Sequence, residues 1–480
     1  MKSITQMAGF VVVGLFVLAL TWMSCSGPVG NEEKGDRQEV SAEVVTSSDT
    51  NTEAVDDAGT PEQAKESVAF EVFPDRSGTT EDPIKQKPEA VEEEAVPEEA
   101  SIEQVSESSS SATYQLVVND GYGSGAYPAG AIVHVWAKFN PYQQLVVGWK
   151  GGDNLLKQPK EWHTTFVMPA RDVTLSPQFV TAQGKLQTLS FQGVKYKKPV
   201  LALIPPNPKG VILAFHGTGG SHKYLQKLET LYLARIAYRR GYAVVSTDAE
   251  EVQAGDTDKN GKIRWNPNIR ASNNVDVRNL QLLGTSLVDQ KILPKGLPLF
   301  AFGMSNGGAM SVSVGEALKM KAVVSYCASG RRDTVAITKT PTMWLMCQKD
   351  SNPQVDNSLA KQHHQTLLGR KVPTVYDSNP PSPLYDGRFF RILGINLPTS
   401  ANIAKELRTN KHVDAKGFFI GSSEAFVKGF QANKKAYPVL SGLKGGLQAD
   451  VLSQVKIMMA DHNMYDDFSS RTIDFFDKYR

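Results

Sequence analysis

The stretch of sequence that decides the fold runs from Leu299 to Lys319 and reads LFAFGMSNGGAMSVSVGEALK. It begins with an apolar run typical of a buried strand, and from Ala309 onward it has the composition of a helix. Between these two parts, Gly303 and Gly307 flank Ser305 in a Gly-x-Ser-x-Gly spacing. A nucleophilic serine on a sharp strand-to-helix turn needs such neighbours, because side chains two residues before or after it would clash. The stretch therefore predicts that Ser305 is a nucleophile at the end of a strand.

A second glycine-rich segment, HGTGG at 216–220, follows the apolar run 211–215. We expect the backbone amide of Thr218 or Gly219 to supply one half of an oxyanion hole and that of Asn306, directly after the nucleophile, to supply the other. The helix that starts after Ser305 adds the positive end of its dipole. His216 is interpreted as a packed strand-end residue, with the role of base as its alternative.

A catalytic acid and a base are expected to follow the serine in that order. Asp350 comes shortly after the apolar run 342–346, and His462 lies in a loop before the last helix. We assign Asp350 to orient the imidazole and His462 to take and return the proton of Ser305. The alternatives are Asp356 for the acid and His363, His364 and His412 for the base.

Apolar strand runs alternate with helical stretches throughout residues 185–480, which predicts a mainly parallel α/β sheet. The segments FHGTGG, GMSNGG and ADHNMYDDF, together with Asp350, resemble those of the α/β-hydrolase family, and most closely the secreted polyhydroxybutyrate-depolymerase-like and feruloyl-esterase-like enzymes. The resemblance implies a serine esterase that needs no cofactor. Because Asp350 and His462 are 112 positions apart, we also expect a helical insertion at about 355–452 that shapes the substrate pocket.

Arg264 and Trp265 are predicted to lie on the rim of that pocket and to bind substrate. Just before them, Asp256, Asp258 and Asn260 resemble the start of a calcium loop, but the twelfth position is proline instead of glutamate. We therefore interpret the segment as a polar turn and predict no metal site, with calcium as the alternative. Cys327 and Cys347 are interpreted as two buried thiols, with a disulfide as the alternative.

Residues 113–181 contain a run of five predicted strands with short turns, at 114–119, 131–137, 145–149, 164–169 and 173–179. The opening YQLVVNDGYGSGAYPAGAIVHVWA, the GW at 148–149 and the closing TTFVMPARDVTLSPQF resemble the internalin-B-type bacterial repeat. This resemblance implies a small all-β, β-grasp-like surface domain. We expect the domain to position the body or to contact envelope polymers. Trp136, Trp149 and Trp162 are candidates for its binding face or for its core.

Charge divides the chain, although the formal net charge of its 480 residues is only +2. Residues 31–112 contain 23 acidic and 6 basic side chains, whereas the rest of the chain contains 27 acidic and 46 basic ones. The segment 26–112 is also rich in Ser, Thr, Pro and Ala, which predicts a disordered acidic linker. No nucleic-acid recognition motif accompanies the basic body, and we expect no nucleic-acid partner.

The N-terminus resembles a bacterial lipoprotein signal. Lys2 precedes the apolar run 8–20, and a small residue stands before Cys25. We expect residues 1–25 to be a signal peptide and Cys25 to be lipidated. This places the protein in the cell envelope, anchored to the outer membrane or the cell surface, with secretion as the alternative.

Taken together, these patterns predict an extracytoplasmic serine hydrolase that acts on a carboxylic ester, polymeric or carbohydrate-linked. A serine peptidase of the same fold and a catalytically inactive surface binding protein are the alternatives. A phosphate-binding enzyme lacks support, because no Gly-x-x-x-x-Gly-Lys motif follows a strand.

Overall fold

The computed structural model describes residues 112–152, 154–270 and 273–480. The predicted signal peptide with Cys25 and nearly all of the predicted acidic linker lie outside these residues. The described residues all belong to one compact unit. No helix in the described part of the chain is both long enough and apolar enough to cross a membrane.

The N-terminal part of this unit consists of seven short strands in two sheets. One sheet has the order β3-β1-β7-β5 and the other the order β2-β4-β6. The strands are β1 (Thr113–Val118), β2 (Gly121–Tyr122), β3 (Gly125–Pro128), β4 (Ile132–Ala137), β5 (Gln144–Lys150), β6 (His163–Val167) and β7 (Val173–Thr181). The prediction of five strands was incomplete, because the glycines at 121 and 125 were interpreted as a turn. They belong to β2 and β3, which pair with β4 and β1.

Trp136, Trp149 and Trp162 are all buried, with at most 4% of each residue exposed. Trp149 Nε1 donates a hydrogen bond to the carbonyl of Glu161, and Trp162 Nε1 donates to Asp466 at 3.2 Å. The three side chains therefore belong to the core and form no exposed binding face.

The larger part is built on an eight-stranded sheet with the order β8-β9-β11-β10-β12-β13-β14-β15. Only β9 runs against its two neighbours, β8 and β11, and all the other pairs are parallel. The strands are β8 (Gln187–Gln192), β9 (Lys197–Leu203), β10 (Gly210–Phe215), β11 (Tyr242–Thr247), β12 (Leu299–Met304), β13 (Ala322–Tyr326), β14 (Thr342–Cys347) and β15 (Thr374–Asn379).

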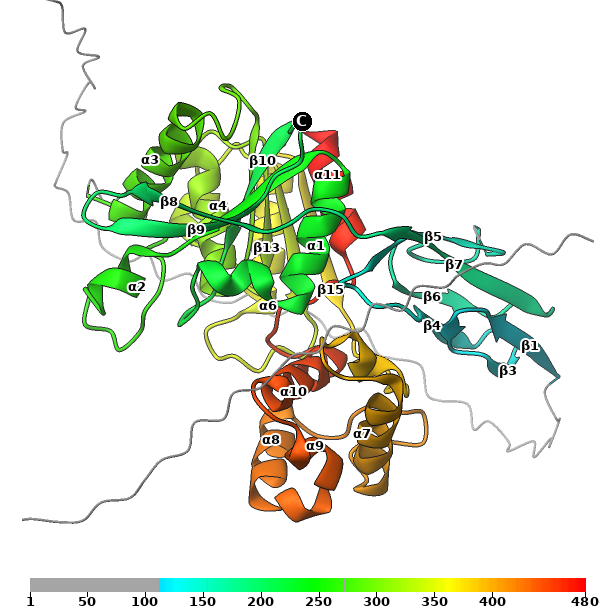
Figure 1. Ribbon diagram of the computed structural model, residues 1–480. Helices are drawn as coiled ribbons and strands as arrows, with labels where there is room; N and C mark the ends of the chain where they lie inside the picture. The colour runs from blue at the N-terminus through cyan, green and yellow to red at the C-terminus, as the bar shows by residue number, and fades with distance from the viewer. Residues whose placement is uncertain (1–111, 153, 271–272) are drawn as a thin grey trace, which may run out of the picture. The chain divides into compact units, whose positions relative to one another are not determined.

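Helices cover both faces of this sheet (Figure 1). On one face, α1 and α11 pack on alternate residues such as Ile212 and Phe302, and on the other α3 and α4 pack on Val211 and Ala301. The helices around this sheet are α1 (Leu228–Arg239), α2 (Glu250–Ala254), α3 (Val275–Asp289), α4 (Asn306–Ala317), α5 (Arg332–Val335), α6 (Asn357–Gly369) and α11 (Ser469–Lys478), with a 3-10 turn η1 (His222–Gln226) before α1. The architecture is α/β-hydrolase-like, as predicted.

A separate group of helices follows β15 and has its own apolar core. It comprises η2 (Arg388–Arg391), α7 (Leu397–Thr409), α8 (Ser423–Ala432), η3 (Lys434–Ala436), α9 (Pro438–Gly442) and α10 (Leu447–Met458). The predicted boundary at 355 is wrong, because α6 packs on β14 and β15, and β15 completes the main sheet. The polar face of α6 and the mostly half-buried residues of β15 hid this from the sequence. The insertion therefore starts after residue 379.

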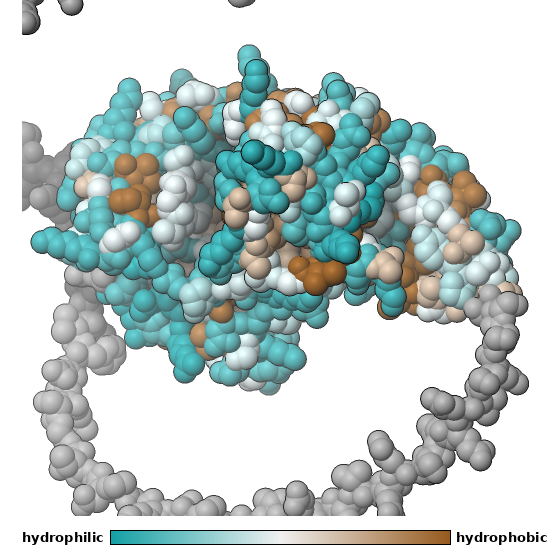
Figure 2. All heavy atoms as spheres, turned by 90° about the horizontal axis from the view of Figure 1, so that it is seen from below, coloured by the Kyte–Doolittle hydropathy of each residue, from teal (hydrophilic) through white to brown (hydrophobic). Residues whose placement is uncertain are grey.

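The surface is mainly hydrophilic on the side where Figure 1 shows α7 to α10. Figure 2 views this side directly and shows only small, separate hydrophobic patches. No broad apolar surface of the kind that inserts into lipid is visible on this face.

The first prediction concerns Gly307, the second glycine of the motif. A Cβ atom at this position would lie 2.2 Å from the carbonyl oxygen of Phe215 in β10. We expect Gly307→Ala to lower the free energy of unfolding by about 1–3 kcal/mol, because backbone must move to relieve the overlap. Urea denaturation measures the change.

The matched control is Gly284→Ala in α3, where a Cβ would meet nothing within 4 Å. This substitution should instead raise the free energy of unfolding by about 0.5–1 kcal/mol, because alanine favours the helix. Equal stability of Gly307→Ala and the wild type would contradict the packing described here.

The second prediction concerns Glu161, which accepts hydrogen bonds from the amides of Ser470 and Arg471 at the start of α11. Burial raises the pKa of Glu161 from 4.5 to about 8, despite these bonds. The native state therefore holds a proton that the unfolded state releases between these two values. Stability should fall as pH rises through this window, by up to about 1.4 kcal/mol per pH unit from this group.

Glu161→Gln should flatten this pH dependence, whereas Glu424→Gln, at an exposed position, should leave it unchanged. Thermal unfolding from pH 5 to pH 8 makes the comparison. A Glu161→Gln profile parallel to that of the wild type would show that Glu161 does not titrate in this range.

Candidate active site

Ser305 lies between β12 and α4 and has a backbone conformation that is rare for a residue with a side chain. Its φ is 59° and its ψ is −125°. The strain is held by the surrounding backbone, since Ser305 N donates to the carbonyl of Tyr326 and Ala309 N donates to the carbonyl of Ser305. This turn presents the Ser305 hydroxyl at the carboxyl end of the sheet, where parallel α/β sheets bind ligands.

Glycine is required at 303 because α4 starts so close to β12. A Cβ atom on Gly303 would lie 2.3 Å from the carbonyl oxygen of Gly307. The two glycines of the motif therefore let the helix pack against the strand ends. The Gly-x-Ser-x-Gly spacing corresponds in this structure to a tight turn.

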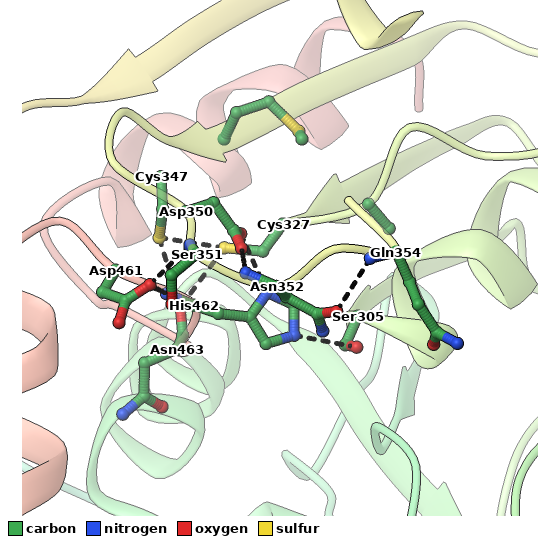
Figure 3. Close-up of polar contacts among 12 residues, drawn as sticks. Ser305, Cys327, Cys347, Asp350, Ser351, Asn352, Gln354, Asp461, His462 and Asn463 are labelled. Carbon is green, nitrogen blue, oxygen red and sulfur yellow. Dashed lines mark hydrogen bonds and ion pairs between the residues drawn. The ribbon is translucent and has the colours of Figure 1, made fainter. Parts of the chain in front are cut away.

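Three predicted side chains meet at this turn, although they come from distant parts of the sequence (Figure 3). His462 Nε2 lies 3.0 Å from Ser305 Oγ, and His462 Nδ1 lies 2.8 Å from Asp350 Oδ2. The side chain of Asp350 is 1% exposed and that of His462 is 17% exposed. Asn352 N donates to the second oxygen of Asp350 at 3.0 Å. The arrangement can move a proton from the serine to the histidine while the carboxylate holds the ring.

Asp461, next to the histidine, is a residue of the candidate site that the sequence reasoning missed. Its Oδ1 accepts hydrogen bonds of 2.7 Å from Ser351 N and from His462 N (Figure 3). Its Oδ2 accepts a hydrogen bond from Ser423 Oγ. Burial opposes ionisation, but these hydrogen bonds hold the pKa of Asp461 below its usual value. The carboxylate thus joins the Asp350 loop, the His462 loop and the start of α8. The sequence ADHN contained this signal only as an acidic residue beside the candidate base.

The three predicted oxyanion-hole amides differ in whether they already donate a hydrogen bond. Gly219 N donates to the carbonyl of Ile263 at 2.8 Å, so this amide is already occupied, and its assignment is corrected. Within the described ranges, the amides of Thr218 and Asn306 have no intramolecular hydrogen-bond acceptor. Both stay available for an oxyanion. The side chain of Asn306 is fixed by the backbone of Trp265. The backbone amide of Trp265 donates to Asn306 Oδ1, and its carbonyl accepts from Asn306 Nδ2.

The prediction that Trp265 lies on the rim of the pocket is therefore wrong. Its side chain lies in the core. It is 1% exposed, packs on Phe215 and His216, and its Nε1 donates to the carbonyl of His216. Arg264 forms an ion pair with Asp258 at 3.6 Å. An exposed loop sequence gave no sign that its tryptophan turns inward.

The alternative candidates lie elsewhere. His216 is fully buried, donates from Nδ1 to the carbonyl of Gly217 and accepts at Nε2 from Ala249 N, and its burial lowers its pKa. Asp356 is the N-cap of α6. His363 contacts the carbonyl of Ser329, His364 contacts Thr374, and His412 contacts Tyr437 in the insertion.

A cleft of about 530 Å³ opens over the serine. Ser305 and His462 line it, together with the side chains of Lys262, Asn352 and Gln354. The last three were not singled out in the sequence, because they lie in loops without a motif. They give the cleft polar groups and one positive charge beside the apolar Met304 and Pro353.

Cys327 and Cys347 are buried free thiols whose sulfur atoms lie 3.0 Å apart. They stand at the ends of β13 and β14, and Cys327 Sγ donates to the carbonyl of Asn463 at 3.3 Å. The pair thus packs beneath the loop that carries His462.

Two groups of side chains in the described ranges have a geometry that could hold a metal ion. One is Cys327 with Asp350 and His462, the last two of which are already hydrogen-bonded to each other. The other is Glu251 with Asp256 and Asp258. The carboxylates of Asp256 and Asp258 accept hydrogen bonds from the backbone amides of Asn260 and Gly261.

Solved structures similar to this chain include several hydrolases. An α/β serine hydrolase without a lid from Xanthomonas campestris is 16% identical, covers 41% of this chain and 85% of its own, and gives a TM-score of 0.30. A dienelactone hydrolase from Anabaena variabilis is 19% identical, and the match covers 48% of this chain and 98% of that protein, with a TM-score of 0.32. A ferulic acid esterase is 12% identical, and the match covers 41% of this chain and 90% of that protein, with a TM-score of 0.32. No family model and no curated protein matches the chain.

The third prediction distinguishes the two acid candidates. Asp350→Asn should lower kcat for an activated ester by roughly 10³- to 10⁴-fold, because an amide at this position favours the wrong imidazole tautomer. Asp356→Asn should leave kcat unchanged, since asparagine caps a helix as well as aspartate does. Steady-state kinetics of both variants, with matched circular dichroism spectra, makes the comparison. A larger loss for Asp356→Asn would reverse the assignment.

Proposed function

We propose that this chain is an extracytoplasmic serine hydrolase that cleaves carboxylic esters. The observation that carries the proposal is the hydrogen-bonded path from Asp350 through His462 to Ser305, with two free backbone amides beside the serine. Its location outside the cytoplasm is proposed from the sequence of residues 1–25 and from the expected lipidation of Cys25.

In the first half of the reaction, Ser305 Oγ attacks the carbonyl carbon of the ester while His462 Nε2 takes the hydroxyl proton. The amides of Thr218 and Asn306 stabilise the negative oxygen that develops. When the carbon–oxygen bond to the alcohol breaks, His462 gives its proton to the leaving oxygen. An acyl group is then bonded to Ser305.

In the second half, His462 takes a proton from water and the resulting hydroxide attacks the acyl carbon. Collapse releases the acid and returns the proton to Ser305. Asp350 stays ionised throughout, keeps the Nδ1 proton of His462 in place and stabilises the imidazolium. Its 1% exposure and the hydrogen bond from Asn352 N hold it in one orientation.

The same geometry could serve a serine peptidase, because the three side chains do not choose between an ester and an amide. The cleft over Ser305 is lined by Met304 and Pro353 as well as by Lys262 and Gln354, and these walls do not choose between the two bonds either. The ester is proposed because the sequence motifs resemble those of esterases. An inactive binding protein would not need the strained φ of 59° at Ser305.

The fourth prediction is that a fluorophosphonate probe labels residues 113–480 at Ser305. Labelling requires a serine activated by a base, so it should be lost in Ser305→Ala and strongly reduced in His462→Ala. The Ser329→Ala variant is a suitable control, because Ser329 lies near the sheet but outside the proposed relay. Mass spectrometry of the labelled peptide identifies the site.

Hydrolysis of p-nitrophenyl acetate and of a matched p-nitroanilide then separates the esterase from the peptidase. We expect cleavage of the ester only. Labelling at a residue other than Ser305, or no labelling of a folded protein, would contradict the proposed function.

A further inference from the structure

A second cavity of about 740 Å³ adjoins the catalytic cleft. The two share Gly217, Thr218 and Met304, so they meet beside the nucleophile. An ester bound at Ser305 has two halves, and each half can occupy one of these spaces. The volume of the second cavity is in the range that holds a small molecule.

The position of His462 decides which half enters which space. The imidazole must give its proton to the leaving alcohol, so the alcohol half belongs in the cleft that His462 lines. The acyl half then points into the second cavity, whose walls do not include His462.

Three separate parts of the chain build the walls of this second cavity. The N-terminal end of α1 supplies Lys227 and Glu229, α10 of the insertion supplies Asp450 and Gln454, and the loop before β5 supplies Tyr142. Gln454 Nε2 donates to Glu229 Oε1 at 2.5 Å, which joins α10 to α1. The Arg235 guanidinium donates to the carbonyl of Pro141, which holds the Tyr142 loop against α1.

The walls combine polar groups with apolar side chains such as Leu228, Ile392 and Met464, so they suit a ligand that has both hydroxyl groups and apolar ring faces. A purely apolar acyl group would remove water from Asp450 and would offer no hydrogen bond in return. Gln454 Oε1 is buried and has no partner among the described residues. Burial also raises the pKa of Glu229 to about 7, so near neutral pH this carboxyl group can donate as well as accept a hydrogen bond.

Charged groups of both signs also line the cavity. Lys223 and Lys227 lie in its walls together with Asp450 and with Glu229, which is partly protonated near neutral pH. A neutral ligand with many hydroxyl groups can bond to all four, and its ring can stack on Tyr142.

We propose that this cavity is the acyl subsite for a neutral, polyhydroxylated acyl group, the sugar-acid half of an aldonic or uronic ester. Its carboxyl group is neutral while it is esterified and becomes negative on hydrolysis. The N-terminal β-strand part contributes to substrate choice through Tyr142. This inference rests on the proposed function.

The fifth prediction tests the subsite with two benzyl esters that share a leaving alcohol. Benzyl glucuronate carries a hydroxylated ring, and benzyl cyclohexanecarboxylate carries a ring of similar size without hydroxyl groups. For the wild type, we expect kcat/KM to be at least about tenfold higher for the glucuronate. The ratio of the two kcat/KM values should fall roughly five- to tenfold in Asp450→Asn and in Tyr142→Ala, the effect of about one lost hydrogen bond or stacking contact.

The matched control is Asp289→Asn at the exposed end of α3, which should keep the wild-type ratio. Fluorophosphonate labelling of every sample reports whether Ser305 is active. Labelled protein without a preference for the glucuronate, or with the same ratio in Asp450→Asn and Tyr142→Ala as in the wild type, would overturn the subsite alone. Folded protein that is neither labelled nor active on either ester would overturn the proposed function and the subsite with it.

Discussion

The close approach of α4 to the strand ends is the constraint on which the rest of this structure depends. Gly303 and Gly307 remove the Cβ atoms that would otherwise lie within 2.3 Å of neighbouring backbone oxygens. Only then can Ser305 keep its φ of 59° and present its hydroxyl above the sheet. The same turn leaves the amide of Asn306 without an acceptor among the described residues. One steric condition thus sets the positions of the proposed nucleophile and of one proposed oxyanion-hole amide.

The other parts of the site are attached to this turn by loops at the carboxyl ends of β10 and β14 and before α11. Asp461 links two of these loops to the insertion, because its carboxylate accepts from Ser351, His462 and Ser423. The position of His462 therefore depends on how the insertion packs. This gives the long stretch between Asp350 and His462 a structural role as well as a place in the wall of the second cavity.

The strands and residues nearest the motif could be predicted because their signals are local. Apolar runs marked β10 to β14, and the glycine spacing marked Ser305. Other features depended on contacts that no local pattern reveals. Trp265 turns into the core to fix Asn306, and Gly219 donates to Ile263, so neither could be placed from composition alone. The half-buried strand β15 lacks an apolar run, so it was assigned to the insertion.

The central claim is that Ser305 carries the acyl group during turnover. Rapid quenching of the wild-type protein with p-nitrophenyl acetate, followed by mass spectrometry of its peptides, measures this directly. The account predicts one acetyl group on the peptide that contains Ser305, formed in the first turnover and lost as acetate is released. Hydrolysis of the ester with no acetyl group on Ser305, or with the group on another residue, would contradict it.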